Sequence, residues 1–184
     1  MDLYKLGWGL RLICYRFRAK VSFPGYIGKP AYISRVAKLR IDKNVRIYPG
    51  LRAELSGKNG CLIIGENTSI GQNFHVVAYG EPIVIGTNVT ISGNVLVTNC
   101  DHDYREIGQH ILSQSVIKNE TCIGDYCFIG YGAVIMAGTK LGNQCIIGAN
   151  SVVRGNYPDY SVIAGNPAKI IKKYNIDLNI WERM

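Results

Sequence analysis

Features that define several other protein classes are missing from this sequence. The 184 residues contain no run of 18 apolar residues, so no membrane-spanning helix is expected. Residues 1–20 lack the apolar core of a secretory signal peptide, because Lys5, Gly7, Gly9 and Arg11 interrupt it. The six cysteines include no Cys-x-x-Cys pair, a spacing typical of zinc and redox motifs. These absences favour a cytoplasmic protein with one domain of ordinary size.

Acidic residues are scarce in the N-terminal part of the chain. Residues 1–52 contain 12 lysines and arginines but only Asp2 and Asp42 as acids, a balance of +10. Residues 53–184 contain nine basic and 11 acidic residues, so the net charge of +8 comes from the N-terminal part. This asymmetry predicts an anionic surface as a partner. No nucleic-acid motif accompanies it, and we expect no nucleic acid partner.

Aliphatic residues recur with a period of six. The longest series is Ile117, Ile123, Ile129, Ile135, Leu141, Ile147 and Val153, with earlier copies at Ile41, Ile47, Ile64, Ile70, Ile85, Ile91 and Val97. A helix face repeats every 3.6 residues and a strand face every two, so neither explains this spacing. A parallel β-helix does, because each coil has three flat faces of about six residues with one aliphatic side chain pointing inward.

Two other residue types follow the same period. Small or β-branched residues stand four positions after the aliphatic ones and are expected to face inward: Thr121, Cys127, Ala133, Thr139, Cys145 and Ser151. Asparagine and aspartate are expected at the corners, in the left-handed backbone region that they tolerate: Asn67, Asn73, Asn88, Asn94, Asn119, Asp125 and Asn143.

The period is interrupted twice. Between Gly71 and Ile85 we expect one expanded corner. Residues 98–115 lose the pattern altogether, which predicts a loop extruded from the solenoid, and long loops on rigid scaffolds tend to carry function. The predicted organisation is therefore an N-terminal helix and linker over 1–30, a solenoid over 31–170 and a C-terminal tail over 171–184.

The first 20 residues predict an amphipathic helix. Its apolar stripe consists of Leu3, Leu6, Leu10, Ile13, Phe17 and Val21. An adjacent aromatic and basic stripe consists of Tyr4, Trp8, Arg11, Tyr15 and Arg18. Two interpretations stay open: the apolar stripe caps the open end of the solenoid, or it lies on an anionic membrane.

Histidine is rare, and two of the three histidines, His102 and His110, lie in the extruded loop; the third is His75. His102 is flanked by Asp101 and Asp103. Histidine has an ordinary pKa near 6.5 and suits general base catalysis. The loop therefore predicts His102 as the base, oriented by Asp101, by Asp103 or by a backbone carbonyl.

Longer stretches resemble a known family. The hexapeptides, the loop T-N-C-D-H-D-Y-R, the stretch I-G-D-Y-C-F-I-G-Y-G-A-V-I-M-A-G and the terminal A-G-N-P-A-K are similar to the left-handed β-helix O-acetyltransferases over about residues 60–173. That family includes galactoside, maltose, nodulation-type and surface-polysaccharide acetyltransferases. The resemblance implies an all-β, left-handed parallel β-helix, a homotrimer, acetyl-CoA bound between neighbouring subunits, and no metal.

The resemblance also implies roles for individual residues. His102 takes the position of the base, Tyr131 lines the thioester end of the coenzyme, and Ala149 contacts the pantetheine arm. Arg154 lies along the coenzyme. The basic residues expected at its phosphates are Lys169, Lys172 and the adjacent Lys173. The expected acceptor contacts are Asn73, His75, Arg105 and Phe128, and two departures from the family are Phe128 in place of a frequent tryptophan and Val77 in place of an asparagine.

The predicted reaction is acetyl transfer from acetyl-CoA to a sugar hydroxyl, in the synthesis of a surface polysaccharide or lipopolysaccharide. A first alternative keeps the chemistry and changes the acceptor to a nucleotide-sugar amine, a serine or an antibiotic. A second is a γ-type carbonic anhydrase, which needs three histidines on one zinc ion. A third is a solenoid without catalytic activity.

Overall fold

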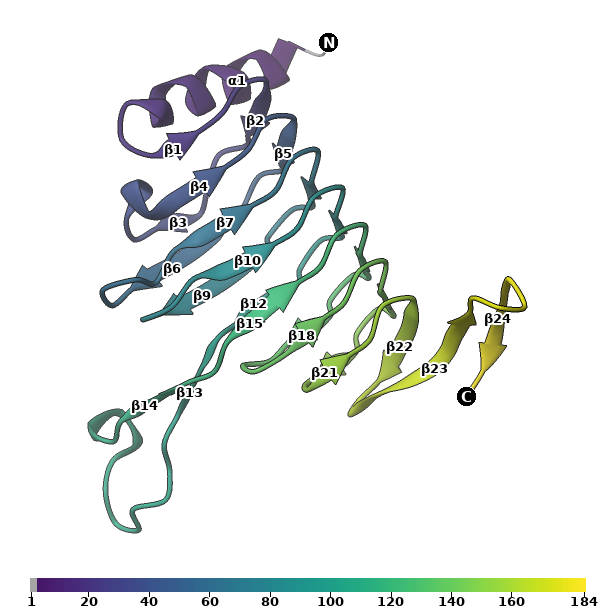
Figure 1. Ribbon diagram of the computed structural model, residues 1–184. Coiled ribbons are helices and arrows are strands. Elements are labelled where there is room, and N and C mark those ends of the chain that lie inside the picture. Colours follow the sequence, from purple (N-terminus) through teal and green to yellow (C-terminus); the bar gives the residue numbers. More distant parts are fainter. Residues whose placement is uncertain (1–2) are drawn as a thin grey trace.

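The computed structural model describes residues 3–184 and shows one helix at the end of a rod of stacked coils (Figure 1). Asp2 of the charge balance, and the side chains of Leu3 and Tyr4 in the predicted stripes, lie outside the described part. Consecutive strands of the solenoid belong to different sheets, and strands within a sheet are parallel; only the β13–β14 pair and the C-terminal β22–β23–β24 strands of the described residues depart from this by pairing antiparallel with their chain neighbours. The predicted parallel β-helix is confirmed.

Three sheets form the faces of the rod. Sheet A contains β1 (Lys20–Val21), β4 (Leu39–Ile41), β7 (Leu62–Ile64), β10 (Ile83–Ile85), β15 (Thr121–Ile123), β18 (Lys140–Leu141) and β21 (Asn156–Tyr157). Sheet B contains β2 (Gly25–Ile27), β5 (Val45–Ile47), β8 (Ser69–Ile70), β11 (Thr90–Ile91), β16 (Phe128–Ile129), β19 (Ile146–Ile147), β22 (Ser161–Gly165), β23 (Ala168–Asn175) and β24 (Ile180–Arg183). Sheet C contains β3 (Tyr32–Ile33), β6 (Arg52–Ser56), β9 (His75–Tyr79), β12 (Leu96–Thr98), β17 (Val134–Ile135) and β20 (Val152–Val153).

The pairing register explains the period of six. Cys122 pairs with Lys140, and Phe128 pairs with Ile146, so one coil in this region takes 18 residues, or six for each face. Earlier coils are longer, because β9 is a five-residue strand that pairs with β6 along its whole length and is followed by a turn. The corner expected between Gly71 and Ile85 is therefore expanded, as the broken period predicts.

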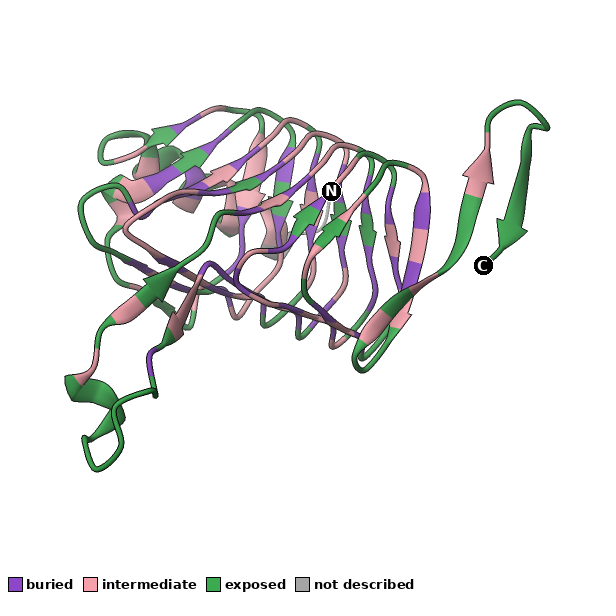
Figure 2. Ribbon diagram, turned by 60° about the horizontal axis from the view of Figure 1, so that its bottom comes forward, coloured by how far each residue is buried: buried purple, intermediate pink, exposed green. Residues whose placement is uncertain are grey.

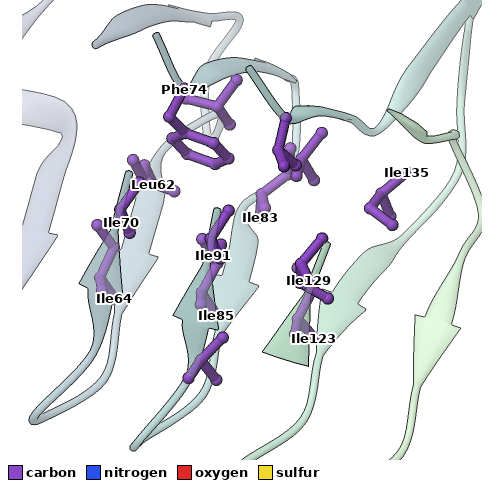
Figure 3. Packing of buried hydrophobic residues seen from close by; sticks show 14 of the residues in the cluster. Leu62, Ile64, Ile70, Phe74, Ile83, Ile85, Ile91, Ile123, Ile129 and Ile135 are labelled. Atoms are coloured by element: carbon purple, nitrogen blue, oxygen red, sulfur yellow. The ribbon is translucent and has the colours of Figure 1, made fainter. Parts of the chain in front are cut away.

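The predicted inward residues form the core (Figure 3). The aliphatic series from Ile123 to Val153 is buried, and so are the small residues that follow four positions later. Each buried aliphatic side chain stabilises the fold by about 1.5–3 kcal/mol. Ile117 was expected to begin this series, and that prediction is wrong. It lies outside the solenoid, in a hairpin strand, and its side chain is 36% exposed.

The corner prediction is confirmed in part. Asn67, Asn73, Asn88 and Asn94 adopt the left-handed region, with φ between 55° and 59°. Asp125 and Asn143 do not; the residues after them, Tyr126 and Gln144, take this conformation instead. The reason is hydrogen bonding between coils: Asp125 Oδ1 accepts from the Thr87 N–H at 2.7 Å, and Asn143 Oδ1 accepts from the Asp125 N–H at 2.9 Å. Asn119, which lies where the chain returns from the extruded loop, does not adopt it either.

The helix α1 (Leu3–Arg16) caps the end of the solenoid. The side that packs is the aromatic and basic stripe, not the apolar stripe that one of the two interpretations expected to cap the solenoid. Leu12 is buried, Trp8 packs against the rings of Tyr26 and Tyr48, and Arg11 Nη1 donates to the Ile27 carbonyl at 2.9 Å. The predicted apolar stripe instead faces outward, and its described members in the helix and directly after it are 40–87% exposed: Leu6, Leu10, Ile13 and Phe17. Capping by that stripe is therefore wrong. Within residues 3–184, no helix is long and apolar enough to cross a membrane.

Candidate functional site

The loop expected over residues 98–115 is an antiparallel hairpin that projects from the rod (Figure 2). Its strands are β13 (Cys100–His102) and β14 (Val116–Lys118), and a short helix η2 (Ile111–Ser113) lies near its tip. A second short helix, η1 (Val36–Lys38), lies far from it in the sequence, before β4. The hairpin leaves the solenoid directly after β12, in the coil that follows the expanded corner.

Asn99 anchors the base of the hairpin. Its side chain is fully buried, its Oδ1 accepts from the Tyr79 N–H at 2.8 Å, and its Nδ2 donates to the Glu81 carbonyl at 2.9 Å. The Asn99 carbonyl accepts from the Asn119 N–H at 2.9 Å, so both hairpin strands meet at this residue. Sequence reasoning missed Asn99; its signal is a polar residue at the position where the hexapeptide pattern stops.

The two aspartates beside His102 bind arginines. Asp101 Oδ2 accepts from Arg154 Nη2 at 2.7 Å, which links the hairpin to the end of β20. Asp103 is buried and accepts from the backbone N–H of Arg105 at 3.1 Å and from its Nε at 2.9 Å. These bonds hold the pKa of Asp103 well below its usual range and raise the pKa of Arg105.

Neither aspartate therefore orients His102 within one chain. Successive side chains of a strand point to opposite faces, so Asp101 and His102 lie on opposite sides of β13. The expectation that Asp101 or Asp103 holds the imidazole has no support in this geometry, because both carboxylates are bound to arginines. His102 is exposed, and among residues 3–184 no side chain or backbone group hydrogen-bonds to its ring.

Other groups of the hairpin have structural roles or are not reactive. His110 Nδ1 accepts from the Leu112 N–H at 3.2 Å and caps η2. Burial raises the pKa of the Cys100 thiol, which disfavours the nucleophilic thiolate. The tip exposes four large apolar side chains, of which Ile107 is 97% exposed: Tyr104, Ile107, Ile111 and Leu112.

A polar cluster lies on the outer surface of sheet C, beside the hairpin. His75 Nε2 lies 3.0 Å from Glu54 Oε1, which also accepts from Arg52 Nε at 2.7 Å. The hydrogen bond from Arg52 lowers the pKa of Glu54, and that from His75 lowers it further. The Arg52 guanidinium lies over the Tyr32 ring at 5.7 Å. The register aligns Tyr32, Arg52 and His75 on neighbouring strands. Sequence reasoning named only His75 of this cluster and missed Tyr32, Arg52 and Glu54.

The predicted coenzyme residues Tyr131, Ala149 and Lys169 lie along one edge of sheet B. Small residues line this edge, because Gly130, Gly148 and Ala164 follow the inward residues of β16, β19 and β22 in turn. A Cβ on Gly130 would lie 2.6 Å from the Ala149 nitrogen, and Ala164 pairs with Lys169 across the next strand. Tyr131 is half-exposed, and its hydroxyl contacts the side-chain amide of Asn94.

The three C-terminal lysines divide between the two faces of β23. Ala164 pairs with Lys169, and Val162 pairs with Lys172 across a bulge that adds one residue to β23. This places Lys169 and Lys172 on the outer face of sheet B and Lys173, which pairs with Ser161, on the other face. Two lysines can therefore act on one ligand along this edge, and the third points away from it.

The remaining predicted contacts are dispersed. Asn73 donates through Nδ2 to Asn94 Oδ1 at 3.0 Å and so belongs to a corner ladder. Phe128 lies exposed on the outer face of sheet B, between Thr90 and Ile146. Arg154 links the hairpin to the coils through Asp101, and Arg105 binds Asp103 within the hairpin, so an acceptor or coenzyme contact for either arginine stays a prediction. Among residues 3–184, no three His, Cys, Asp or Glu side chains gather as a metal site would need.

Known proteins share this architecture. The family profile for the bacterial transferase hexapeptide (six repeats) matches residues 120–155, and that for the hexapeptide repeat of succinyl-transferase matches residues 61–99. WbbJ of Escherichia coli K12, assigned to lipopolysaccharide biosynthesis as an O-acetyl transferase, is 31% identical over 161 residues, which are 84% of this chain and 81% of that protein.

Two solved structures are similar to most of this chain. The polysialic acid-specific acetyltransferase NeuO has a TM-score of 0.56 at 30% identity, over 79% of this chain and 67% of that one. An N-acyltransferase from Bacillus cereus, AntD, solved with dTDP and coenzyme A, has a TM-score of 0.71 over 84% and 83%; its 22% identity supports the fold alone. The repeat profiles and the identity to WbbJ over most of both chains show that this chain belongs to the hexapeptide-repeat transferases, among their acetyltransferases.

Proposed function

We propose that this protein transfers the acetyl group of acetyl-CoA to a sugar hydroxyl during synthesis of a surface polysaccharide or lipopolysaccharide, with His102 as the general base. The observation that carries the proposal is the anchored hairpin, on which His102 is exposed and its ring has no hydrogen-bond partner in the described part of the chain. The relatives support the acceptor class, because WbbJ and NeuO are named for a lipopolysaccharide and for polysialic acid.

The chemistry needs a base and an oxyanion donor. The His102 imidazole takes the proton of the acceptor hydroxyl while its oxygen attacks the thioester carbonyl carbon. The tetrahedral intermediate collapses with cleavage of the carbon–sulfur bond, and the imidazolium returns its proton to the leaving sulfur of coenzyme A. The oxyanion is stabilised by a backbone N–H, because pre-oriented donors act strongly in a site shielded from water.

A homotrimer completes the site. The hairpin points away from its own solenoid (Figure 2). Its tip exposes the side chains of Tyr104, Ile107 and Leu112. Exposed apolar side chains gathered at one place mark an interface. A neighbouring subunit covering this tip would place its own coils opposite His102. Sedimentation analysis tests this arrangement, with three times the mass of the chain as the expected result.

The sheet B edge is the proposed coenzyme path. Gly130, Gly148 and Ala164 leave room for a narrow pantetheine arm between Tyr131 at one end and Lys169 with Lys172 at the other. These ends are separated by three strand spacings, roughly 14 Å. The acceptor is expected to bind beside the His75–Glu54 pair on sheet C, where a hydrogen-bonded imidazole and a carboxylate can hold sugar hydroxyls.

The decisive experiment measures acetyl-CoA turnover with a glycan acceptor. Replacing His102 with alanine is expected to lower turnover by about 10²–10⁴-fold, the usual contribution of a general base. The matched control is His110→Ala, which removes a helix cap in the same hairpin and is expected to stay within a few-fold of wild type. Turnover close to wild type in a folded His102→Ala trimer contradicts the proposal.

A further inference from the structure

The helix α1 has two apolar faces, and the solenoid uses only one. Trp8, Leu12 and Tyr15 pack against the first coil. Residues 6, 10, 13 and 17 follow the i, i+4, i+7, i+11 spacing of a single helix stripe and point to the opposite side. These four apolar side chains are exposed to solvent, most of all Phe17. Capping of the solenoid therefore does not explain them.

The outward stripe continues into the first turn of the chain. A groove of about 470 Å³ lies between the helix and the Phe23–Tyr26 segment, with Leu6, Leu10 and Ile13 along its helical wall. Phe23 forms part of the other wall and is half-exposed. The apolar area therefore spans the helix and the adjoining turn.

Cations surround this area, with few acids among them. Arg16 and Arg18 lie exposed at the end of the helix, and Arg46 lines the groove. A second groove behind Phe23 brings the acids Asp42 and Glu66 together with Arg16 and Lys43, and Glu66 forms an ion pair with Lys43 at 3.3 Å. The cations Arg16, Arg18, Lys43 and Arg46 outnumber the acids Asp42 and Glu66, so the surroundings of the apolar area carry a net positive charge.

We propose that the outer face of α1 docks on an anionic lipid bilayer. Apolar side chains ringed by arginine and lysine match the chemistry of such a surface, where the acyl boundary accepts the stripe and phosphate groups meet the cations. A second copy of this chain fits less well, because like charges would then face each other across the contact. The helix lies at one end of the rod and the hairpin projects from its side, so docking leaves the hairpin free (Figure 1).

The test uses the full-length protein and co-sedimentation with vesicles. Vesicles of phosphatidylglycerol and phosphatidylcholine are compared with vesicles of phosphatidylcholine alone, and we expect at least tenfold weaker binding to the neutral ones. The double variant Leu10→Ser, Phe17→Ser is expected to lose at least tenfold in binding to the anionic vesicles. The matched control, Ile176→Ser with Leu178→Ser, removes exposed apolar side chains at the other end of the rod and should bind like wild type.

A second variant separates charge from folding. Arg16→Gln with Arg18→Gln changes only exposed side chains, and it should weaken anionic binding and its dependence on salt. Equal binding of wild type to both vesicle types, or no binding, overturns the proposal. Full binding to anionic vesicles by Leu10→Ser, Phe17→Ser or by Arg16→Gln, Arg18→Gln also overturns it. The oligomer mass of Leu10→Ser, Phe17→Ser could also fall while wild type binds no vesicles. That result would identify the outer face of α1 as a contact between copies of this chain, and it would likewise overturn the proposal.

Discussion

The coils over residues 121–153 and the hairpin over residues 100–118 both contain aliphatic residues, but the two regions differ in whether these side chains are buried. In the coils, the aliphatic side chains of the six-residue series are buried between the coils above and below, and neighbouring strands pair in parallel. In the hairpin, the aliphatic side chains are exposed and the pairing is antiparallel. The coils that keep the six-residue period form a rigid scaffold. The hairpin, which interrupts this period, exposes side chains that do not contribute to the core of the scaffold.

The sharpest test of this contrast compares two isoleucines of the same period. Ile135→Ala leaves a cavity in the buried column and is expected to lower the free energy of unfolding by about 2–5 kcal/mol. Ile117→Ala lies in the hairpin and is expected to change it by less than about 1 kcal/mol. Chemical denaturation measures both. Equal losses would mean that the hairpin folds as part of the core.

The next test loosens the hairpin where it meets the coils. Asn99→Ala removes a buried side chain and leaves the Tyr79 N–H and the Glu81 carbonyl without their partner, which costs about 1–3 kcal/mol. Amide hydrogen exchange should rise across β13 and β14 first, and turnover should fall with it. Asn94→Ala is the control for hydrogen exchange alone, because Asn94 belongs to an exposed corner ladder and its side chain also contacts Tyr131. Unchanged exchange in the Asn99 variant would show that β13–β14 pairing alone holds the hairpin.

A test on the coil side concerns the two lysines that share a face. Lys169→Glu with Lys172→Glu is expected to raise the KM for acetyl-CoA several-fold, and added salt should reduce the effect because it screens exposed charges. Lys173→Glu is the control, since the bulge turns Lys173 to the other face. If Lys173→Glu alone has as large an effect, the coenzyme does not follow this edge.

The smallest effect concerns the acid beside His75. The hydrogen bond from Arg52 keeps the pKa of Glu54 below its ordinary 4.5, so the stability that it contributes is present above pH 4.5 and is lost as the pH falls through the lowered value. Arg52→Gln should raise this pKa, which an NMR titration of the Glu54 carboxyl measures. A pKa that stays lowered in the variant would assign the shift to His75.

The period of six predicts the sheets, the core and the place of the hairpin, because each depends on nearby residues. Contacts between distant residues could not be predicted in this way. Asp101 and Arg154 are 53 positions apart, and their pairing depends on the direction in which the hairpin leaves the coils. Ile117 keeps the six-residue spacing by sequence alone, although the coil does not begin until Thr121.

The N-terminal helix shows a different limit. Both of its stripes contain apolar or aromatic side chains, so the sequence does not decide which one packs. The decision comes from Tyr26 and Tyr48, whose rings receive Trp8 and turn the leucine stripe outward. The left-handed sense of the coils and the trimer stay predictions of the family resemblance.

The stacking of coils also fixes the distance between the helix α1 and the hairpin along the rod. Each coil rises by one strand spacing, and three steps separate the coil of β2 beneath α1 from the coil of β12 that sends out the hairpin. Three spacings span roughly 14 Å, and the helix adds about 10 Å. A bilayer against α1 would thus lie about 25 Å from the hairpin base. Under that arrangement the length of the acceptor would decide whether it is modified. A glycan long enough to extend from its lipid anchor over this distance would reach His102, and a bare headgroup would not.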